Sequence, residues 1–162
     1  MKYELASDTW TVDEIKAIQS VVDSNRYTMG PRVKNFENKF QEFFGVNYSV
    51  MMNSGSSANL LAIASLFFKK DNPLKRGDEV IVPTVSWSTT FSPLQQYGLK
   101  VKFVDIDINT LNYDIQKLNS AITTKTKLVI AVNLLGNSND FNSILELKKK
   151  FGFYLIEDNC ES

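Results

Sequence analysis

The chain has 162 residues, and its 18 lysines and arginines balance 18 aspartates and glutamates, so charge gives no reason to expect nucleic acid or an anionic membrane as a partner. It contains no histidine and one cysteine, which excludes from these residues a histidine general base, a Ser-His-Asp triad, an internal disulfide and a zinc cluster. Apolar residues make up 43% of the chain, which is typical of a globular protein with a core.

The start of the chain lacks the apolar core of a signal peptide. The longest apolar stretch, 60–68, is interrupted by Ser65 and is too short to cross a bilayer. We therefore expect a cytoplasmic protein.

Two amphipathic helices are predicted in the first part of the chain. Thr11 and Glu14 have the spacing of a capping box, and apolar residues follow at helical intervals up to Val22. Pro31 fits the first turn of a second helix, whose apolar face continues to Phe44 and ends at Gly45.

Strands and helices alternate along the rest of the chain. Short apolar runs predict strands over 48–52, 79–82, 100–105, 127–132 and 153–157. Helical spacing predicts helices over 60–68, over a short stretch that ends at Tyr97, over 114–122 and over 141–151.

This alternation indicates an α/β fold with a mainly parallel sheet. Strands such as VIVP and LVIAV are apolar throughout, which is expected when helices cover both faces of the sheet in an α/β/α sandwich of three layers. Ligands of such sheets bind beyond the carboxyl ends of the strands. The polar loops after Met52, Val82, Val132 and Glu157 should share that edge. The last of these loops is barely begun at Ser162, so we expect a chain that has been cut short.

The first candidate for chemistry is the polar loop Asn53-Ser54-Gly55-Ser56-Ser57, which leads from the first predicted strand into a helix. Small residues let the backbone approach a ligand closely, and free N–H groups at a helix N-terminus suit a phosphate. The loop matches neither Walker A nor GxGxxG, so it supports neither a P-loop nor a Rossmann fold. The alternative is an ordinary strand-to-helix turn with a serine cap.

Two further segments carry candidate side chains. Trp87 lies in the loop Val85-Ser86-Trp87-Ser88-Thr89-Thr90, where it could stack on a flat cofactor or, as is commoner, fill the core. Glu157 and Asp158 stand at a buried strand end, where a carboxylate needs a positive partner such as a protonated heterocyclic nitrogen. The alternative for Asp158 is a cap on the following turn.

Together these segments place a phosphate cradle, a stacking ring and a carboxylate on one edge of the sheet. Pyridoxal 5′-phosphate (PLP) needs that set, because its phosphate, its ring and its pyridine nitrogen each require one of the three.

Five segments carry a family resemblance in the same order: NSGSSANLLAI, KRGDEVIVPTVSWSTT, YGLKVKFVDIDINTLNYDI, NLLGN and LIEDNCES. They cover nearly the whole chain and resemble the DegT/DnrJ/EryC1/StrS family of sugar aminotransferases, which are fold-type-I PLP enzymes. The resemblance implies that residues 1–162 are the N-terminal part of the PLP-binding large domain of a homodimeric enzyme. The remainder of that domain and a C-terminal small domain are then absent.

The resemblance also implies roles for single residues. Gly55 and Ser56 match the pair that holds the cofactor phosphate, with Ser56 in place of the commoner threonine. Trp87 matches the residue stacked on the ring, and Asp158 matches the aspartate paired with the pyridine nitrogen. Glu161 stands where many relatives have a glutamine near the ring hydroxyl.

Other positions are carried over in the same way. Asn25, Arg26, Tyr27 and Thr28 match a segment that lines the nucleotide-sugar site, and Asn133 matches a position close to the ring. The resemblance implies that the catalytic base lies downstream of Ser162. It is a lysine in the aminotransferases of the family and a histidine in its dehydratases, so the 162 residues alone should be inactive.

Within the family, SWSTT, SPLQQYG, NLLGN and EDNCES are most similar to the branch that removes the 3-hydroxyl group of GDP-4-keto-6-deoxy-D-mannose in the synthesis of colitose, an O-antigen dideoxysugar. The implied cofactors are PLP and pyridoxamine phosphate, and the implied partners are the nucleotide sugar and L-glutamate. One alternative is a nucleotide-sugar 4-aminotransferase of the perosamine type. A second is a non-catalytic module that binds a nucleotide sugar or a phosphate.

Overall fold

A computed structural model describes residues 7–162 of the chain. It divides into two compact units, Met1–Met51 and Met52–Ser162, and each is described here by itself.

The N-terminal unit contains two helices, α1 (Val12–Asp23) and α2 (Pro31–Phe44). The predicted capping box begins α1, since Thr11 Oγ1 accepts from the Asp13 N–H at 3.1 Å while Glu14 Oε2 accepts from the Thr11 N–H at 2.6 Å. Pro31 occupies the first turn of α2, and Gly45 ends this helix with a left-handed φ of 64°. Both helices are confirmed with the boundary signals that the sequence contains.

The strand predicted over 48–52 is wrong. This stretch has no secondary structure, and the Met51 N–H donates to Glu37 Oε1 at 3.0 Å rather than to a neighbouring strand. Tyr48 and Val50 are exposed. An apolar run becomes a strand only where another strand completes its backbone hydrogen bonds, and none of the described residues does so here.

The C-terminal unit is built on one sheet of four parallel strands in the order β2-β1-β3-β4. The strands are β1 (Glu79–Pro83), β2 (Lys100–Val104), β3 (Thr126–Val132) and β4 (Tyr154–Asp158). The predicted parallel sheet is therefore confirmed, with strand ends that differ from the expected ones by one residue.

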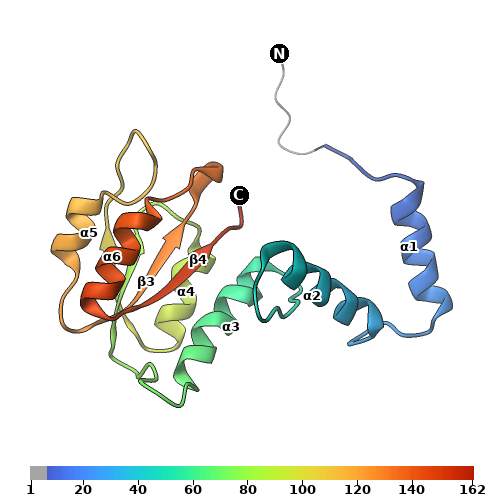
Figure 1. Cartoon of the computed structure of the whole chain (residues 1–162), viewed down its shortest axis with the longest axis horizontal. Coiled ribbons are helices and arrows are strands. Elements are labelled where there is room, and N and C mark those ends of the chain that lie inside the picture. The colour runs from blue at the N-terminus through green and yellow to red at the C-terminus, as the bar shows by residue number, and fades with distance from the viewer. Residues whose placement is uncertain (1–6) are drawn as a thin grey trace. The chain divides into compact units, whose positions relative to one another are not determined.

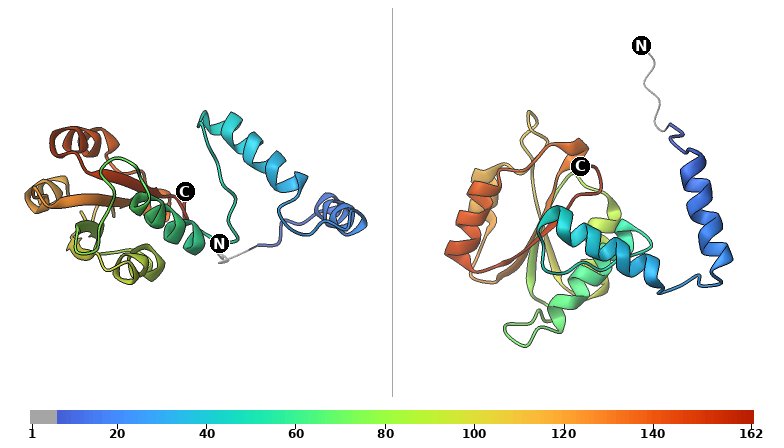
Figure 2. Two further views of the ribbon diagram at one scale, coloured as in Figure 1. Left: turned by 90° about the horizontal axis from the view of Figure 1, so that it is seen from below. Right: turned by 45° about the vertical axis from the view of Figure 1, so that its right-hand side comes forward.

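Helices cover both faces of this sheet, which confirms the layers of an α/β/α sandwich (Figures 1 and 2). Apolar side chains of α3 (Gly55–Phe67) and α4 (Ser88–Gln96) pack on one face, and those of α5 (Ile115–Ala121) and α6 (Phe141–Phe151) pack on the other. Val80 and Val82 point to the first face and Ile81 to the second, and all three are fully buried. That double burial is why the strand is apolar throughout.

The order of the strands creates a topological switch point between β1 and β3. The chain leaves β1 through α4 toward β2, and it leaves β3 through the short 3-10 helix η1 (Leu134–Gly136) and α6 toward β4. The two connections cover opposite faces, so their loops diverge at the carboxyl ends of the strands. A crevice is expected at that position in an open parallel sheet.

Candidate functional site

A cavity of about 290 Å³ lies beyond the carboxyl ends of β1, β3 and β4 and beside the first turn of α3. Its lining includes all five predicted cofactor residues: Gly55, Ser56, Trp87, Asp158 and Glu161. The remaining lining residues are Asn59, Thr89, Thr90, Val132, Leu134 and Cys160. Side chains that are more than 100 positions apart in the sequence thus meet at one site, where the sheet topology predicts it.

The first turn of α3 contains Gly55 and Ser56, the residues for which the sequence predicts phosphate binding. Ser54 caps the helix by accepting from the Ser57 N–H at 3.2 Å, so the serine cap is also present. The N–H groups of Gly55 and Ser56 stand in the first turn, where a helix has no internal acceptor for them. A Cβ at Gly55 would meet only Cys160 Sγ, at 3.9 Å, so packing within the protein does not demand a glycine there.

Trp87 occupies the loop after β1 and is the residue immediately before α4. Trp87 is 74% exposed and lines the cavity, so it is not a core aromatic within residues 7–162. An exposed ring at a cavity wall is available to stack on a flat ligand.

Asp158 ends β4, and its carboxylate accepts three hydrogen bonds. Oδ2 accepts from Asn59 Nδ2 and from Thr90 Oγ1, both at 2.9 Å, and Oδ1 accepts from the Cys160 N–H at 3.2 Å. The last bond shows that Asp158 also caps the turn after the strand.

No cation neutralises this carboxylate within residues 7–162. The ion pairs found there join Lys34 to Glu37 and Lys117 to Asp105 and Asp114. The half-buried anion of Asp158 therefore faces the cavity with neutral donors only.

Glu161 lines the same cavity and holds the loop after β3. Its Oε2 accepts from the Leu135 N–H at 2.5 Å, and a Cβ at Gly136 would come within 3.3 Å of the Glu161 carbonyl oxygen. Leu135 and Gly136 have φ values of 52° and 80°. This contact fixes the position of η1 beside the cavity.

Asn133 is 5% exposed, and the residues on either side of it line the cavity. Its Nδ2 donates to Glu157 Oε1 at 2.7 Å and to Asn159 Oδ1 at 2.6 Å, and its Oδ1 accepts two bonds from Asn139. The side chain therefore joins the loops after β3 and β4 to each other.

Sequence reasoning missed Asn59 and assigned no role to Thr90. Asn59 lies four residues after Gly55, so helical spacing places both on one face of α3 and could have identified it. Thr90 is 1% exposed, and its position three residues after Trp87 gives no comparable signal.

The predicted nucleotide-sugar residues Asn25, Arg26, Tyr27 and Thr28 belong to the N-terminal unit, in the loop between α1 and α2. Arg26, Tyr27 and Thr28 line a cavity of about 250 Å³ in that unit. Asn25 has a left-handed φ of 53° and accepts from the Tyr27 hydroxyl at 3.2 Å. These contacts give the loop a defined shape.

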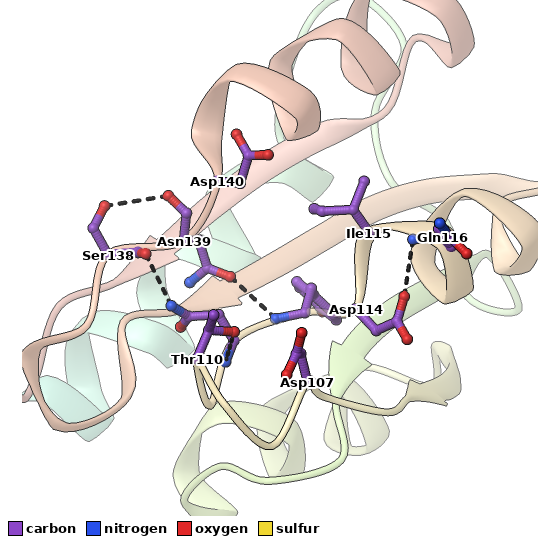
Figure 3. Close-up of a pocket in the computed structure, with 10 residues that line it drawn as sticks. Asp107, Thr110, Asp114, Ile115, Gln116, Ser138, Asn139 and Asp140 are labelled. Atoms are coloured by element: carbon purple, nitrogen blue, oxygen red, sulfur yellow. Dashed lines mark hydrogen bonds between the residues drawn. The ribbon is translucent and has the colours of Figure 1, made fainter.

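A larger hollow of about 590 Å³ lies where the loop after β2 meets the segment before α6 (Figure 3). Carboxylates of Asp107, Asp114 and Asp140 line it, yet no metal-binding cluster of acidic, cysteine or histidine side chains exists in the described part of the chain. Asn112 holds the two segments together by donating to the carbonyls of Asn137 and Ser138. This hollow contains none of the predicted site residues.

No helix among residues 7–162 is both long and apolar enough to cross a membrane.

Comparison with known proteins adds independent findings. The sequence profile described as the DegT/DnrJ/EryC1/StrS aminotransferase family matches residues 8–162. A GDP-4-keto-6-deoxy-D-mannose 3-dehydratase from Yersinia pseudotuberculosis is 60% identical over the whole chain, which spans 41% of the length of that relative.

Solved structures show the same likeness. A GDP-4-keto-6-deoxymannose-3-dehydratase with a trapped PLP-glutamate geminal diamine is 60% identical and superposes with a TM-score of 0.95, over 99% of this chain and 42% of that one. A variant of such an enzyme, in which a histidine is replaced by asparagine, contains GDP-perosamine and superposes with the same TM-score of 0.95, 60% identity and coverage of 99% and 42%.

Proposed function

The chain belongs to the DegT/DnrJ/EryC1/StrS aminotransferase family, and on that premise we propose that its cavity binds PLP. We further propose that the intact protein uses PLP to remove the 3-hydroxyl group of GDP-4-keto-6-deoxy-D-mannose. The relative that is named a 3-dehydratase and the solved structure that contains a PLP-glutamate adduct are each 60% identical to this chain over nearly its whole length. The first supports the proposed reaction, and the second supports the proposed cofactor.

The observation that carries the cofactor assignment is the carboxylate of Asp158. It is held by three neutral donors at a cavity wall and pairs with no cation among the described residues. A half-buried anion of this kind fits a cationic ligand group, and the protonated pyridine nitrogen of PLP is one. The rest of the lining fits the same molecule, because Trp87 offers a ring and α3 offers an N-terminus for a phosphate.

Each residue then has a defined task. The N–H groups of Gly55 and Ser56, with the Ser56 hydroxyl, would hold the phosphate, and Trp87 would cover one face of the ring. Asp158 would keep the ring nitrogen protonated, and Glu161 would lie near the ring hydroxyl. When bound, PLP supplies an electron sink for negative charge that develops beside its ring.

The proposed reaction needs a base that removes a proton from the cofactor-bound substrate. If that base is a histidine, it comes from outside these 162 residues, because they contain no histidine. A histidine base cannot form a covalent bond to the cofactor as a lysine does, and this difference favours elimination of the hydroxyl over transfer of an amino group. We therefore assign Asp158 and Glu161 to the catalytic site and propose that another residue, outside these 162, acts as the base.

The substrates follow from the same relatives. One of the similar solved structures contains a PLP-glutamate adduct, and another contains bound GDP-perosamine. We therefore propose L-glutamate and a GDP-sugar as the partners of this protein. Asn25, Arg26, Tyr27 and Thr28 are the proposed contacts to the nucleotide sugar. We also propose that residues 1–162 form the N-terminal part of a PLP-binding large domain in a cytoplasmic homodimer.

The test uses the protein expressed from its complete coding region, with PLP, L-glutamate and GDP-4-keto-6-deoxymannose. A 3-dehydratase yields a deoxygenated keto sugar and releases ammonia, whereas a 4-aminotransferase retains the nitrogen on the sugar. Mass spectrometry of the sugar and an ammonia assay distinguish the two, and the absence of both products would leave the non-catalytic module.

Two variants test the site in the same preparation. Asp158→Asn should lose most turnover but keep part of the cofactor, because the phosphate and ring contacts remain. Trp87→Ala should raise the dissociation constant of PLP. Near wild-type turnover by the first variant, or an unchanged dissociation constant in the second, would contradict the corresponding role.

A further inference from the structure

The carboxylate of Asp158 is held by two side chains from neighbouring helices of the C-terminal unit. Asn59 belongs to α3, and Thr90 belongs to α4. Both donate to the same oxygen, Oδ2, at 2.9 Å. The Thr90 hydroxyl is buried, since that residue is only 1% exposed, so its position is fixed by the protein rather than by solvent.

The distribution of these donors is unequal between the two carboxylate oxygens. A carboxylate oxygen has about two lone-pair positions. Within residues 7–162, Oδ2 accepts from two side chains, whereas Oδ1 accepts only from the Cys160 N–H, at 3.2 Å. One acceptor position of Oδ1 therefore remains for a ligand.

We infer that Thr90 and Asn59 are positioning residues, which together fix the Asp158 carboxylate so that Oδ1 accepts from the cationic nitrogen of the cofactor. This inference rests on the proposed function, because it concerns the same site. Neither side chain needs to touch the cofactor nitrogen to act. Their effect is to prevent rotation of the carboxylate, so that Oδ1 stays aligned for a charge-assisted contact with the nitrogen.

Replacement of Thr90 by valine tests this role, because the two side chains have almost the same shape and the change removes only the hydroxyl. Without that donor, the carboxylate is less constrained, and we expect the dissociation constant of PLP to rise about tenfold. Thr90→Ser keeps a hydroxyl and should restore binding. Thr84→Val is the matched control, since Thr84 is an exposed threonine in the segment between β1 and α4 that does not line the cavity.

The protonation of the cofactor nitrogen distinguishes a positioning role from a merely structural one, because loss of a structural contact would not change the pH at which this nitrogen loses its proton. PLP labelled with 15N in its ring is bound to the protein expressed from its complete coding region, and the 15N chemical shift is followed across pH. We expect the nitrogen of the Thr90→Val complex to lose its proton at a lower pH than that of the wild type. Asn59→Ala, which replaces a half-buried side chain of α3 by a strong helix former, should shift the titration in the same direction.

The outcomes separate the two proposals. A wild-type protein that binds no PLP overturns the proposed function. A wild type that binds PLP with a protonated nitrogen, together with valine and alanine variants whose dissociation constants and titrations are unchanged, overturns only the role of Thr90 and Asn59. Weaker binding and an earlier loss of the proton in both variants, with recovery in Thr90→Ser, support it.

Discussion

Replacing Asn133 by alanine should destabilise the protein, because this side chain joins the loops after β3 and β4. Its Oδ1 accepts from the Asn139 N–H at 3.0 Å, and Asn139 is 5% exposed. Alanine leaves that buried donor without its partner, which costs about 1–3 kcal/mol, and removes two bonds to exposed acceptors at about 0.5–1 kcal/mol each. We expect the free energy of unfolding to fall by about 2–5 kcal/mol.

The assay is urea unfolding followed by circular dichroism, with the protein expressed from its complete coding region. Asn137→Ala is the matched control, since this exposed asparagine lies in the same loop and should change stability by less than about 0.5 kcal/mol. If the two alanine variants unfold within that margin of each other, the bonding role of Asn133 is refuted.

Asn133→Asp tests the bonds that Asn133 donates, while it keeps the acceptor for Asn139. The change keeps the acceptor for Asn139 but replaces the donor that lies 2.7 Å from Glu157 Oε1 and 2.6 Å from Asn159 Oδ1. Two carboxylates then face each other at neutral pH and repel. The variant should be unstable at pH 7 and should approach the wild type in acid, where one carboxyl group is protonated and can donate.

Two further predictions concern the sheet and its helices. Although burial opposes the shift, hydrogen bonds from Thr126 and Thr123 and the charges of Lys102 and Lys125 hold the pKa of Glu79 below its ordinary value of 4.5. The stability from this lowered pKa is present above the unfolded pKa and is lost as pH falls through the folded one, so Thr126→Val should differ from wild type more in urea unfolding at pH 7 than at pH 3. Gly152 ends α6 with φ 77° and open space around it. Gly152→Ala should therefore cost about 1 kcal/mol from backbone strain alone in the same assay, and a neutral result would contradict the left-handed cap.

Most of the sheet can be predicted from the sequence because a strand that is buried on both faces appears as a run of consecutive apolar residues. Val80, Ile81 and Val82 alternate between two cores, and each must be apolar for its own reason. The stretch 48–52 shows that such an apolar run is not sufficient to form a strand. Its side chains resemble those of a strand, but a strand also needs a partner, and pairing is a property of distant residues.

The same distinction applies to the candidate site. Trp87 and Asp158 could be predicted because each follows or ends a strand, and chain order brings such positions to one edge. Gly55 does not follow a strand, since residues 48–52 form none, and its prediction rests on the small polar residues at the start of a helix. The partners of Asp158 could not be predicted in this way. Asn59 and Thr90 lie 99 and 68 positions from it. Asn59 has a local signal in its helical spacing from Gly55, whereas Thr90 has none.

The cavity beyond β1, β3 and β4 takes its walls from segments that begin at Gly55 and end at Glu161. The ribosome makes those segments in order, so the walls are incomplete until β4 has joined the sheet and the residues after it have emerged. A ligand that fits there binds the assembled state and not the unfolded chain. At a free concentration of 100 times its dissociation constant, it would add about 2.7 kcal/mol to the stability of that state. The supply of the ligand in the cell would then govern how long newly made protein survives chaperones and proteases.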